Sequence, residues 1–376
     1  MNDPVMRSSL RRTVGTLMAL AAVVALFAVP VAGTRAMVQD LFMVLTMLIL
    51  ALNWNILAGF AGLVSVGQQA FVGIGAYAMF GAVILGGLDP LVGILIGGVA
   101  AMLFAIPMAF FTFRLQGAYF AVGTWVAAEI ARLVLAQWKA LGGGTGTSLP
   151  RGTTRDMFGV DVIGSVLDIS AAAASDALTY WLALILALVT LGASYVFLRS
   201  AKGLGLQAIR DNAEAARSVG VDPTRLKAQV FFLTALGTGL CGGLLFVQIT
   251  RVTPDAAFAL IDWTAYVIFI VVIGGIGTLP GPIVGVAVFY ALQRLLADYG
   301  TVYLIVLGLI GIAVMLFARR GLWGLFSQWT GIELLTLRQR PPRHLLGAMT
   351  APAPRAGKEP EPGAAMVPGM RGEVRP

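Results

Sequence analysis

The chain has 376 residues, of which 58% are hydrophobic and only 12% are charged. A soluble domain carries about 25% charged residues, so this composition excludes a soluble globular protein. The formal net charge of +8 does not indicate nucleic-acid binding, because lysine and arginine concentrate in the cytoplasmic loops of membrane proteins. We expect an all-α, polytopic membrane protein. Lipid offers no hydrogen-bond partners to the backbone, so a segment that spans it must satisfy its own backbone groups, as a helix or a closed barrel does.

Apolar runs of about 20 residues, long enough to span a bilayer, recur along most of the chain. They predict about ten transmembrane helices. In chain order the predicted spans are about 13–33, 37–58, 69–86, 91–113, 117–137, 177–198, 228–249, 262–277, 281–297 and 300–318.

Basic residues orient these spans. Arg7, Arg11 and Arg12 precede the first span and predict a cytoplasmic N-terminus, residues 1–12. Ten spans return the C-terminus to the cytoplasm, where Arg319 and Arg320 follow the last span.

The two ends of the chain are interpreted separately. The transmembrane domain is predicted at 13–334, and the tail 335–376, rich in proline, glycine, alanine and arginine, is predicted to be disordered in the cytoplasm. Residues 13–33 also resemble a cleavable signal peptide, which would leave nine spans and an external N-terminus.

Two loops are longer than the others. The predicted periplasmic loop 138–176 is rich in glycine, serine, threonine and aspartate, and it is either a flexible connection or a docking or gating surface. Its Gly142–Thr147 run is no dinucleotide-binding fingerprint, because no strand precedes it. The predicted cytoplasmic loop 199–227 is basic and polar between two apolar runs.

Glycine and proline interrupt the spans in two clusters, which occupy similar places in the two halves of the chain and fit an internal repeat. The predicted helix breaks are Gly59, Gly62, Gly67, Gly274, Gly275, Gly277, Pro280 and Pro282. Such segments either line a cavity or allow close helix packing. The polar candidates for a translocation path near the first cluster are Asn53, Asn55, Gln68 and Gln69. Helix capping or hydrogen bonds between helices explain these four equally well.

Ionisable residues inside the spans are few. Glu129 and Arg132 lie three apart on one helical face and form either a structural ion pair or part of the path. Arg294 lies near the end of a span, and Asp40 and Asp262 lie at span boundaries. A carrier driven by protons or sodium would show more buried carboxylates.

Residues for catalysis and metal binding are missing from the sequence. There is no phosphate-binding loop motif, one histidine, His344, in the tail, and one cysteine, Cys241, inside an apolar run. A metal site needs several ligands. We therefore predict no metal, no cofactor and no catalytic residues on this chain.

The cytoplasmic loop contains an amphipathic pattern. Leu206, Ile209, Ala213 and Ala216 recur at helical spacing, and Gly220 is placed to end the helix. The charged residues Arg210, Asp211, Glu214 and Arg217 fall on the other faces. The pattern predicts a short helix, either an ordinary interfacial helix or one that inserts into a cleft of a motor subunit.

The Glu214-Ala215-Ala216 run with Gly220 four residues later resembles the coupling loop of bacterial ABC importer permeases. The wider run 208–221 resembles that of the branched-chain amino acid importer permeases. Three further blocks are similar to this family: 55–67 with its continuation to Tyr77, 274–282 and 317–322. The resemblance covers about 40–325, and the chain length is similar to that of the larger of the two permeases in such systems.

The resemblance implies the ABC importer permease fold in the bacterial inner membrane. It implies a second homologous permease, two cytosolic ATPase subunits that carry ATP and Mg, and a periplasmic solute-binding protein. The residues that would couple to the ATPases are Arg210, Asp211, Glu214, Ala215, Ala216 and Gly220. The solute would be a branched-chain amino acid or a related small organic solute. Two departures are Gln68, where the family often has histidine, and Ala213, where the coupling helix commonly has its acidic residue.

Two other classes of protein remain open from the sequence alone. One is a self-contained, ion-coupled secondary transporter or channel for a small solute, which needs no ATPase. The other is a membrane scaffold with no solute path. Uptake in the absence of an ATPase distinguishes the first of these from an ATP-driven importer.

Overall fold

A computed structural model describes residues 20–296, 302–318 and 321–330, all within one compact unit, Met1–Leu337. The predicted cytoplasmic N-terminus, residues 1–12, and the predicted disordered tail, 335–376, lie outside the described residues.

The described residues are mainly helical, and the all-α class predicted from the sequence is confirmed. A first helix covers Leu20–Ala32. The α-helices that follow are α2 Arg35–Asn55, α3 Gln68–Ile84, α4 Pro90–Thr112, α5 Ala118–Ala136, α6 Val160–Leu167, α7 Ala171–Arg199, α8 Ala201–Asp211, α9 Ala213–Ser218, α10 Pro223–Ile249, α11 Pro254–Ala257, α12 Tyr266–Gly274, α13 Gly281–Leu296, α14 Val302–Phe317 and α15 Gly321–Thr330. The shorter elements are the π-helices η1 Ile56–Phe60 and η4 Ile261–Ala265, the 3₁₀ turns η2 Lys139–Leu141 and η3 Gly143–Thr145, and the strands β1 Thr147–Ser148 and β2 Arg251–Val252.

Each predicted span contains an apolar helix. Among the described residues, six helical segments are long and apolar enough to cross a membrane: Arg35–Phe60, Pro90–Thr112, Ala118–Ala136, Ala171–Arg199, Pro223–Ile249 and Pro254–Gly274. Shorter apolar helices are Leu20–Ala32, α3 and α13, and α14 with α15 forms a pair bent by 47°. The count of about ten spans is therefore consistent with the structure. The start of the first predicted span, 13–19, is not described.

Two spans begin earlier than predicted, because polar residues in their first turns obscure the helix start. Helix α7 begins at Ala171 instead of 177, after Ser170, whose side chain accepts a hydrogen bond from the Ala173 amide. The span that ends in α12 begins at Pro254 instead of 262. There Thr253 caps the helix and proline occupies its first position.

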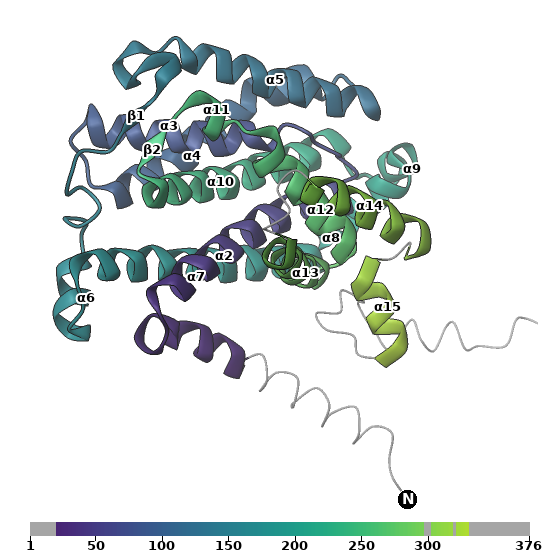
Figure 1. Ribbon diagram of the computed structural model, residues 1–376. Coiled ribbons are helices and arrows are strands. Elements are labelled where there is room, and N and C mark those ends of the chain that lie inside the picture. Colours follow the sequence, from purple (N-terminus) through teal and green to yellow (C-terminus); the bar gives the residue numbers. More distant parts are fainter. Residues whose placement is uncertain (1–19, 297–301, 319–320, 331–376) are drawn as a thin grey trace, which may run out of the picture. The chain divides into compact units, whose positions relative to one another are not determined.

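Helices α3, α4 and α10 pack side by side through glycines (Figure 1). A Cβ atom on Gly75 would lie 2.2 Å from the carbonyl oxygen of Gly239, and one on Gly97 would lie 2.4 Å from that of Gly75. Without side chains the backbones approach closely, as is typical of helix packing in membranes. Helix α2 packs against α7, α10, α12 and α13.

The predicted periplasmic loop 138–176 is folded onto the helix ends. Strand β1 pairs with β2 in antiparallel register, with Thr147 opposite Val252. Leu141, Met157 and Val160 of the loop are buried in the main apolar core. The helix α6 also lies within this loop. The loop 138–176 therefore packs as part of the fold.

The two ends of α10 contact different segments of the chain. Helix α10 contacts α8 and α9 near its start, the end predicted to be cytoplasmic, and β2 at its finish, the end predicted to be outside (Figure 1). Each end of the membrane helices carries its own polar network.

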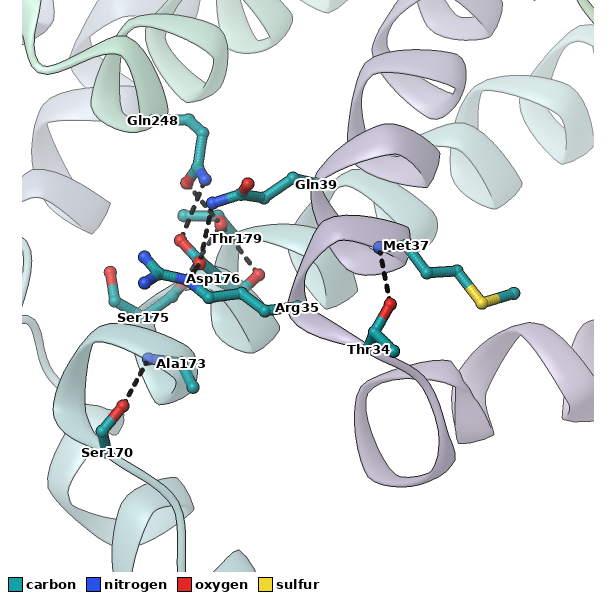
Figure 2. A network of polar contacts seen from close by, with 10 residues as sticks. All are labelled: Thr34, Arg35, Met37, Gln39, Ser170, Ala173, Ser175, Asp176, Thr179 and Gln248. Carbon is teal, nitrogen blue, oxygen red and sulfur yellow. Dashed lines mark hydrogen bonds and ion pairs between the residues drawn. The ribbon is translucent and has the colours of Figure 1, made fainter.

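Asp176 of α7 is the centre of the outer network (Figure 2). Its side chain is only 9% exposed and forms an ion pair with Arg35 at the start of α2. The carboxylate also accepts hydrogen bonds from Gln39 at 3.0 Å and from Gln248 of α10 at 2.9 Å. Thr179 donates to Gln248 at 3.1 Å. Asp176 thus joins α2, α7 and α10, although the sequence suggested only a residue of the outer loop.

Replacing Asp176 with asparagine is expected to destabilise the protein by about 1–3 kcal/mol, because the amide would turn a donor toward the donors of its partners. The melting temperature in detergent, followed by tryptophan fluorescence, measures the effect. Asp161→Asn on α6, where the carboxylate is exposed, is the matched control and should melt like the wild type. Equal melting temperatures for the two variants would contradict the assigned role of Asp176.

Candidate functional site

The cytoplasmic segment between α7 and α10 forms two helices, α8 and α9, where the sequence predicted one short helix that includes Leu206 and ends at Gly220. Asn212 separates them in an extended conformation, with φ −157° and ψ 107°. Its side-chain oxygen accepts hydrogen bonds from the amides of Glu214 and Ala215, both at 3.0 Å. An asparagine that caps α9 in this way competes with a continuous helix.

The apolar face predicted for this segment is confirmed. Leu206 and Ile209 of α8 and Ala216 of α9 are buried, and Ala213 is partly buried. They belong to an apolar cluster that also contains Leu279 and residues of η1. The segment is therefore packed onto the cytoplasmic ends of the membrane helices.

The opposite face of the segment is exposed. Asp211, Glu214, Ala215 and Gly220 are exposed. Gly220 has φ +89°, and its amide donates to the carbonyl of Arg217 at 3.0 Å, so the predicted glycine termination of the helix is confirmed. Of the six predicted coupling residues, these four are accessible in this chain, whereas Ala216 faces the bundle.

Arg210, the remaining predicted coupling residue, links α8 to the membrane helices. Its Nη1 donates to the carbonyl oxygen of Gly59, in η1, at 2.6 Å. Because η1 ends the span Arg35–Phe60, its last carbonyls lack partners within the helix and carry partial negative charge. A guanidinium at this position both satisfies a carbonyl and complements the helix dipole.

The two predicted break regions meet at the same place. Asn55, at the end of α2, donates through Nδ2 to the carbonyl oxygen of Thr278 and accepts from the amide of Gly277, both at 2.8 Å. A Cβ atom on Gly59 would lie 2.5 Å from the Gly277 amide nitrogen. Gly277 itself has φ +75°, a conformation that glycine adopts without strain. We call Asn55, Gly59, Arg210, Gly277 and Thr278 the cytoplasmic junction.

The other predicted breaks surround this junction. Gly62 has φ +69°, and a Cβ atom there would lie 3.3 Å from Cγ of Arg210. Gly274 and Gly275 end α12, Pro280 precedes α13, and Pro282 is the second residue of α13, where a missing amide hydrogen costs nothing.

Gly67 lies away from the junction. A Cβ atom on Gly67 would lie 2.3 Å from the carbonyl oxygen of Thr124 in α5. Gly67 thus allows close contact between the start of α3 and α5.

The C-terminal helix reaches the same region. A Cβ atom on Gly321, the first residue of α15, would lie 2.3 Å from Cα of Gly275. Parts of the four segments that carry the sequence resemblance therefore meet here: Gly59 contacts Arg210 of the coupling segment, Asn55 contacts Gly277 and Thr278, and Gly321 approaches Gly275.

The remaining polar candidates for a path are buried and form hydrogen bonds within a helix or between helices. Asn53 donates to the carbonyl of Ile49 at 3.0 Å and Gln68 to that of Leu50 at 2.9 Å. Gln69 accepts a hydrogen bond from Thr264 of η4. The Gln68 Oε1 atom has no hydrogen-bond partner among the described residues. Their assignment to a translocation path stays a prediction.

Glu129 and Arg132 form the ion pair that their spacing predicts. Arg132 also pairs with Asp255 of α11, with 2.7 Å between Nη1 and Oδ1. The Asp255 side chain is 84% exposed. The group joins α5 to α11 at the outer end, far along the helices from the cytoplasmic junction.

The described part of the chain contains no group of three or more histidine, cysteine, aspartate or glutamate residues that could hold a metal ion. Cys241 is fully buried, with Sγ 3.6 Å from the carbonyl oxygen of Thr46. His344 lies outside the described residues.

The sequence profile of the family described as "Branched-chain amino acid transport system / permease component" matches residues 36–318. The chain belongs to this family. It is a multi-pass permease of the bacterial inner membrane, and the resemblance found in its coupling segment and glycine-rich blocks is confirmed.

Two relatives carry the same description, "High-affinity branched-chain amino acid transport system permease protein LivM". The permease is 29% identical to the protein of Salmonella typhimurium over 323 residues, which cover 81% of this chain and 74% of the relative. It is 27% identical to the protein of Escherichia coli K12 over 304 residues, which cover 78% and 71%. No solved structure gave a significant match.

Two features of the permease are visible only in the structure. Thr278 joins the junction through its backbone carbonyl, which leaves no trace in the side-chain pattern. Asp176 follows a polar serine just before an apolar run, and this position suggested a loop. An isolated carboxylate at the start of a span is the signal that indicates a buried partner network.

Proposed function

We propose that this permease is a transmembrane subunit of an ATP-driven ABC importer that carries branched-chain amino acids, or a related small organic solute, into the cytoplasm. The observation that carries the proposal is the contact between Arg210 of α8 and the carbonyl of Gly59 at the end of the α2–η1 span. It connects a surface segment, with one face free for a partner, to the membrane helices.

The proposed mechanism is a mechanical one. Movement of α8 and α9, imposed by a partner on Asp211, Glu214, Ala215 and Gly220, pulls on Gly59 through Arg210. Asn55 passes this movement to Gly277 and Thr278 at the α12–α13 break. Glycine backbones allow these segments to change angle without side-chain clashes. The α2 and α12 spans would thus open or close together.

The partners in this proposal are a second homologous permease, two cytosolic ATPases and a periplasmic solute-binding protein. ATP and Mg bind to the ATPases, so the permease needs no cofactor and no catalytic residue of its own. An ion-coupled secondary transporter is the competing function. It predicts uptake that survives removal of the ATPases and collapses with the ion gradient, which proteoliposomes with and without ATPase subunits distinguish directly.

Replacing Ala215 with glutamate is expected to lower ATP-driven uptake about tenfold or more, because leaving a carboxylate unpaired in a subunit interface costs about 1–3 kcal/mol. The residue is exposed on α9, so the melting temperature should not change. Uptake of radiolabelled leucine and co-purification of the ATPases are the measurements.

The control for Ala215→Glu is Ala171→Glu, the same substitution at an exposed position at the outer end of α7. It should retain both uptake and ATPase binding. Normal uptake by Ala215→Glu, at normal amounts of protein in the membrane, would show that α9 is not part of the proposed ATPase contact.

A further inference from the structure

A groove of about 450 Å³ opens between α2, η4 with α12, and α13. Asp40 lies five residues after the start of α2, and Arg294 lies two residues before the end of α13. Both of these helix ends are predicted to be at the outer side of the membrane. The volume falls within the range of about 300–1,000 Å³ that is common for small-molecule sites. We call this the outer groove.

Three acidic or basic side chains line the outer groove: Asp40, Asp262 and Arg294. Arg294 pairs with Asp40, and its Nε donates to the hydroxyl of Tyr290 at 3.0 Å. A guanidinium has five N–H donors, so donors of Arg294 remain for another acceptor. Its side chain is 57% exposed.

Asp262 is exposed in the groove, and its carboxylate accepts no hydrogen bond from any other residue that the structure describes. With Asp40 paired to Arg294, Asp262 is the acidic side chain of the groove that has no basic partner among the described residues. An ionisable residue within a span costs free energy unless it meets water or an opposite charge, and such residues mark solute pathways. A cation that enters the groove would be stabilised by Asp262.

The backbone around Asp262 is held in an unusual conformation. Residue 262 lies in η4, a π-helical turn, and such turns are found preferentially at functional sites. Thr264, in the same turn, bonds to Gln69, and Trp263 donates from Nε1 to the carbonyl of Ala256 at 2.7 Å. These contacts fix the turn from two sides and so position the carboxylate.

Apart from Tyr266, Tyr290 and Gln293, the rest of the groove is apolar. Its wall includes Met43 and Met47 of α2, Trp263 of η4 and Phe289 of α13. Unbranched thioether side chains and aromatic rings adapt to apolar ligands of different shape. A negative group, a positive group with free donors and an apolar wall thus lie in one groove.

We propose that the outer groove is a subsite for an amino acid with an apolar side chain, in which Asp262 binds the ammonium group and Arg294 the carboxylate. The proposal rests on the proposed import function for the identity of the solute. Met43, Met47 and Phe289 contact the apolar side chain. A phosphatidylethanolamine headgroup shares the pairing of a primary ammonium with an anion, so the test separates these two sources.

The test uses the full-length chain in phosphatidylcholine nanodiscs without ATP, labelled by a diazirine analogue of L-leucine and mapped by mass spectrometry. We expect adducts on α2, η4 and α13 within the groove. Excess L-leucine should prevent labelling, whereas 4-methylpentanoate, which lacks the ammonium group, and 3-methylbutylamine, which lacks the carboxylate, should compete about 10- to 100-fold less well.

Asp262→Asn should reduce labelling by a similar factor, and Asp161→Asn, on exposed α6, should not. The competition series uses the unchanged protein, so it decides the matter even if Asp262→Asn does not fold. Adducts outside the groove, undiminished labelling of Asp262→Asn, or equal competition by the three compounds would overturn the proposal.

The lipid composition of the nanodiscs is the last variable of the labelling experiment. Labelling that disappears when phosphatidylethanolamine is added to the nanodiscs would assign the groove to the lipid headgroup and overturn the amino-acid subsite. Because labelling needs no ATP, loss of the subsite would leave ATP-driven import standing. Conversely, uptake without any ATPase would refute the proposed function, whereas labelling of the groove would still support the amino-acid subsite.

Discussion

Arg210→Gln is expected to reduce ATP-driven uptake about 10- to 100-fold, because a hydrogen bond to a charged group contributes about 1.5–3 kcal/mol. The guanidinium joins α8 to the carbonyl of Gly59, and glutamine is too short and uncharged to replace it there. Assembly with the ATPases should persist, since the apolar face of α8 remains buried. ATP hydrolysis should then continue without matching solute uptake.

The measurement is the ratio of leucine transported to ATP hydrolysed in proteoliposomes. Arg225→Gln is the matched control, because Arg225 is 86% exposed and pairs only locally, with Asp222. Arg210→Lys keeps the charge but loses the planar geometry, so an intermediate ratio is expected. An unchanged ratio in Arg210→Gln would show that movement passes from α8 by another route.

Gly59→Ala is expected to cost about 1–3 kcal/mol of stability and to abolish most uptake, because the added methyl group overpacks the junction. The new Cβ would lie 2.5 Å from both Asn55 Oδ1 and the Gly277 amide nitrogen, and 2.8 Å from the Gly277 Cα. Backbone atoms cannot rotate away as a side chain can. The α12–α13 break would have to move away from η1 and break the Asn55 hydrogen bond to Gly277.

Melting temperature in detergent and uptake in proteoliposomes measure this effect. Gly192→Ala in α7 is the matched control, since nothing beyond the local helix backbone and the adjoining residues lies within 4 Å of the added Cβ. Alanine favours a helix over glycine by about 1 kcal/mol, so the control should be as stable as the wild type or slightly more so. If Gly59→Ala and Gly192→Ala had the same stability and uptake, the close contact between η1 and the α12–α13 break would not be required for function.

The sequence alone predicted the class of protein, the approximate spans and the coupling segment. Apolar run length, the helical spacing of Leu206 and Ile209, and the terminating Gly220 are local properties, so they can be recognised without knowing any contact. The glycine-rich blocks also sufficed for the family resemblance. Local capping was less visible: Asn212 divides the coupling segment into α8 and α9, and Ser170 starts α7 earlier than its apolar residues suggest.

The tertiary structure alone decided which of these residues work together. Arg210 and Gly59 are 151 positions apart, and Asn55 and Thr278 are 223 apart, so no periodicity relates them. Likewise, Asp262 and Arg294 lie on different spans and line one groove only because η4 and α13 both pack near α2. A hydrogen bond depends on distances of about 3 Å, which helix packing sets and which no run of sequence encodes by itself.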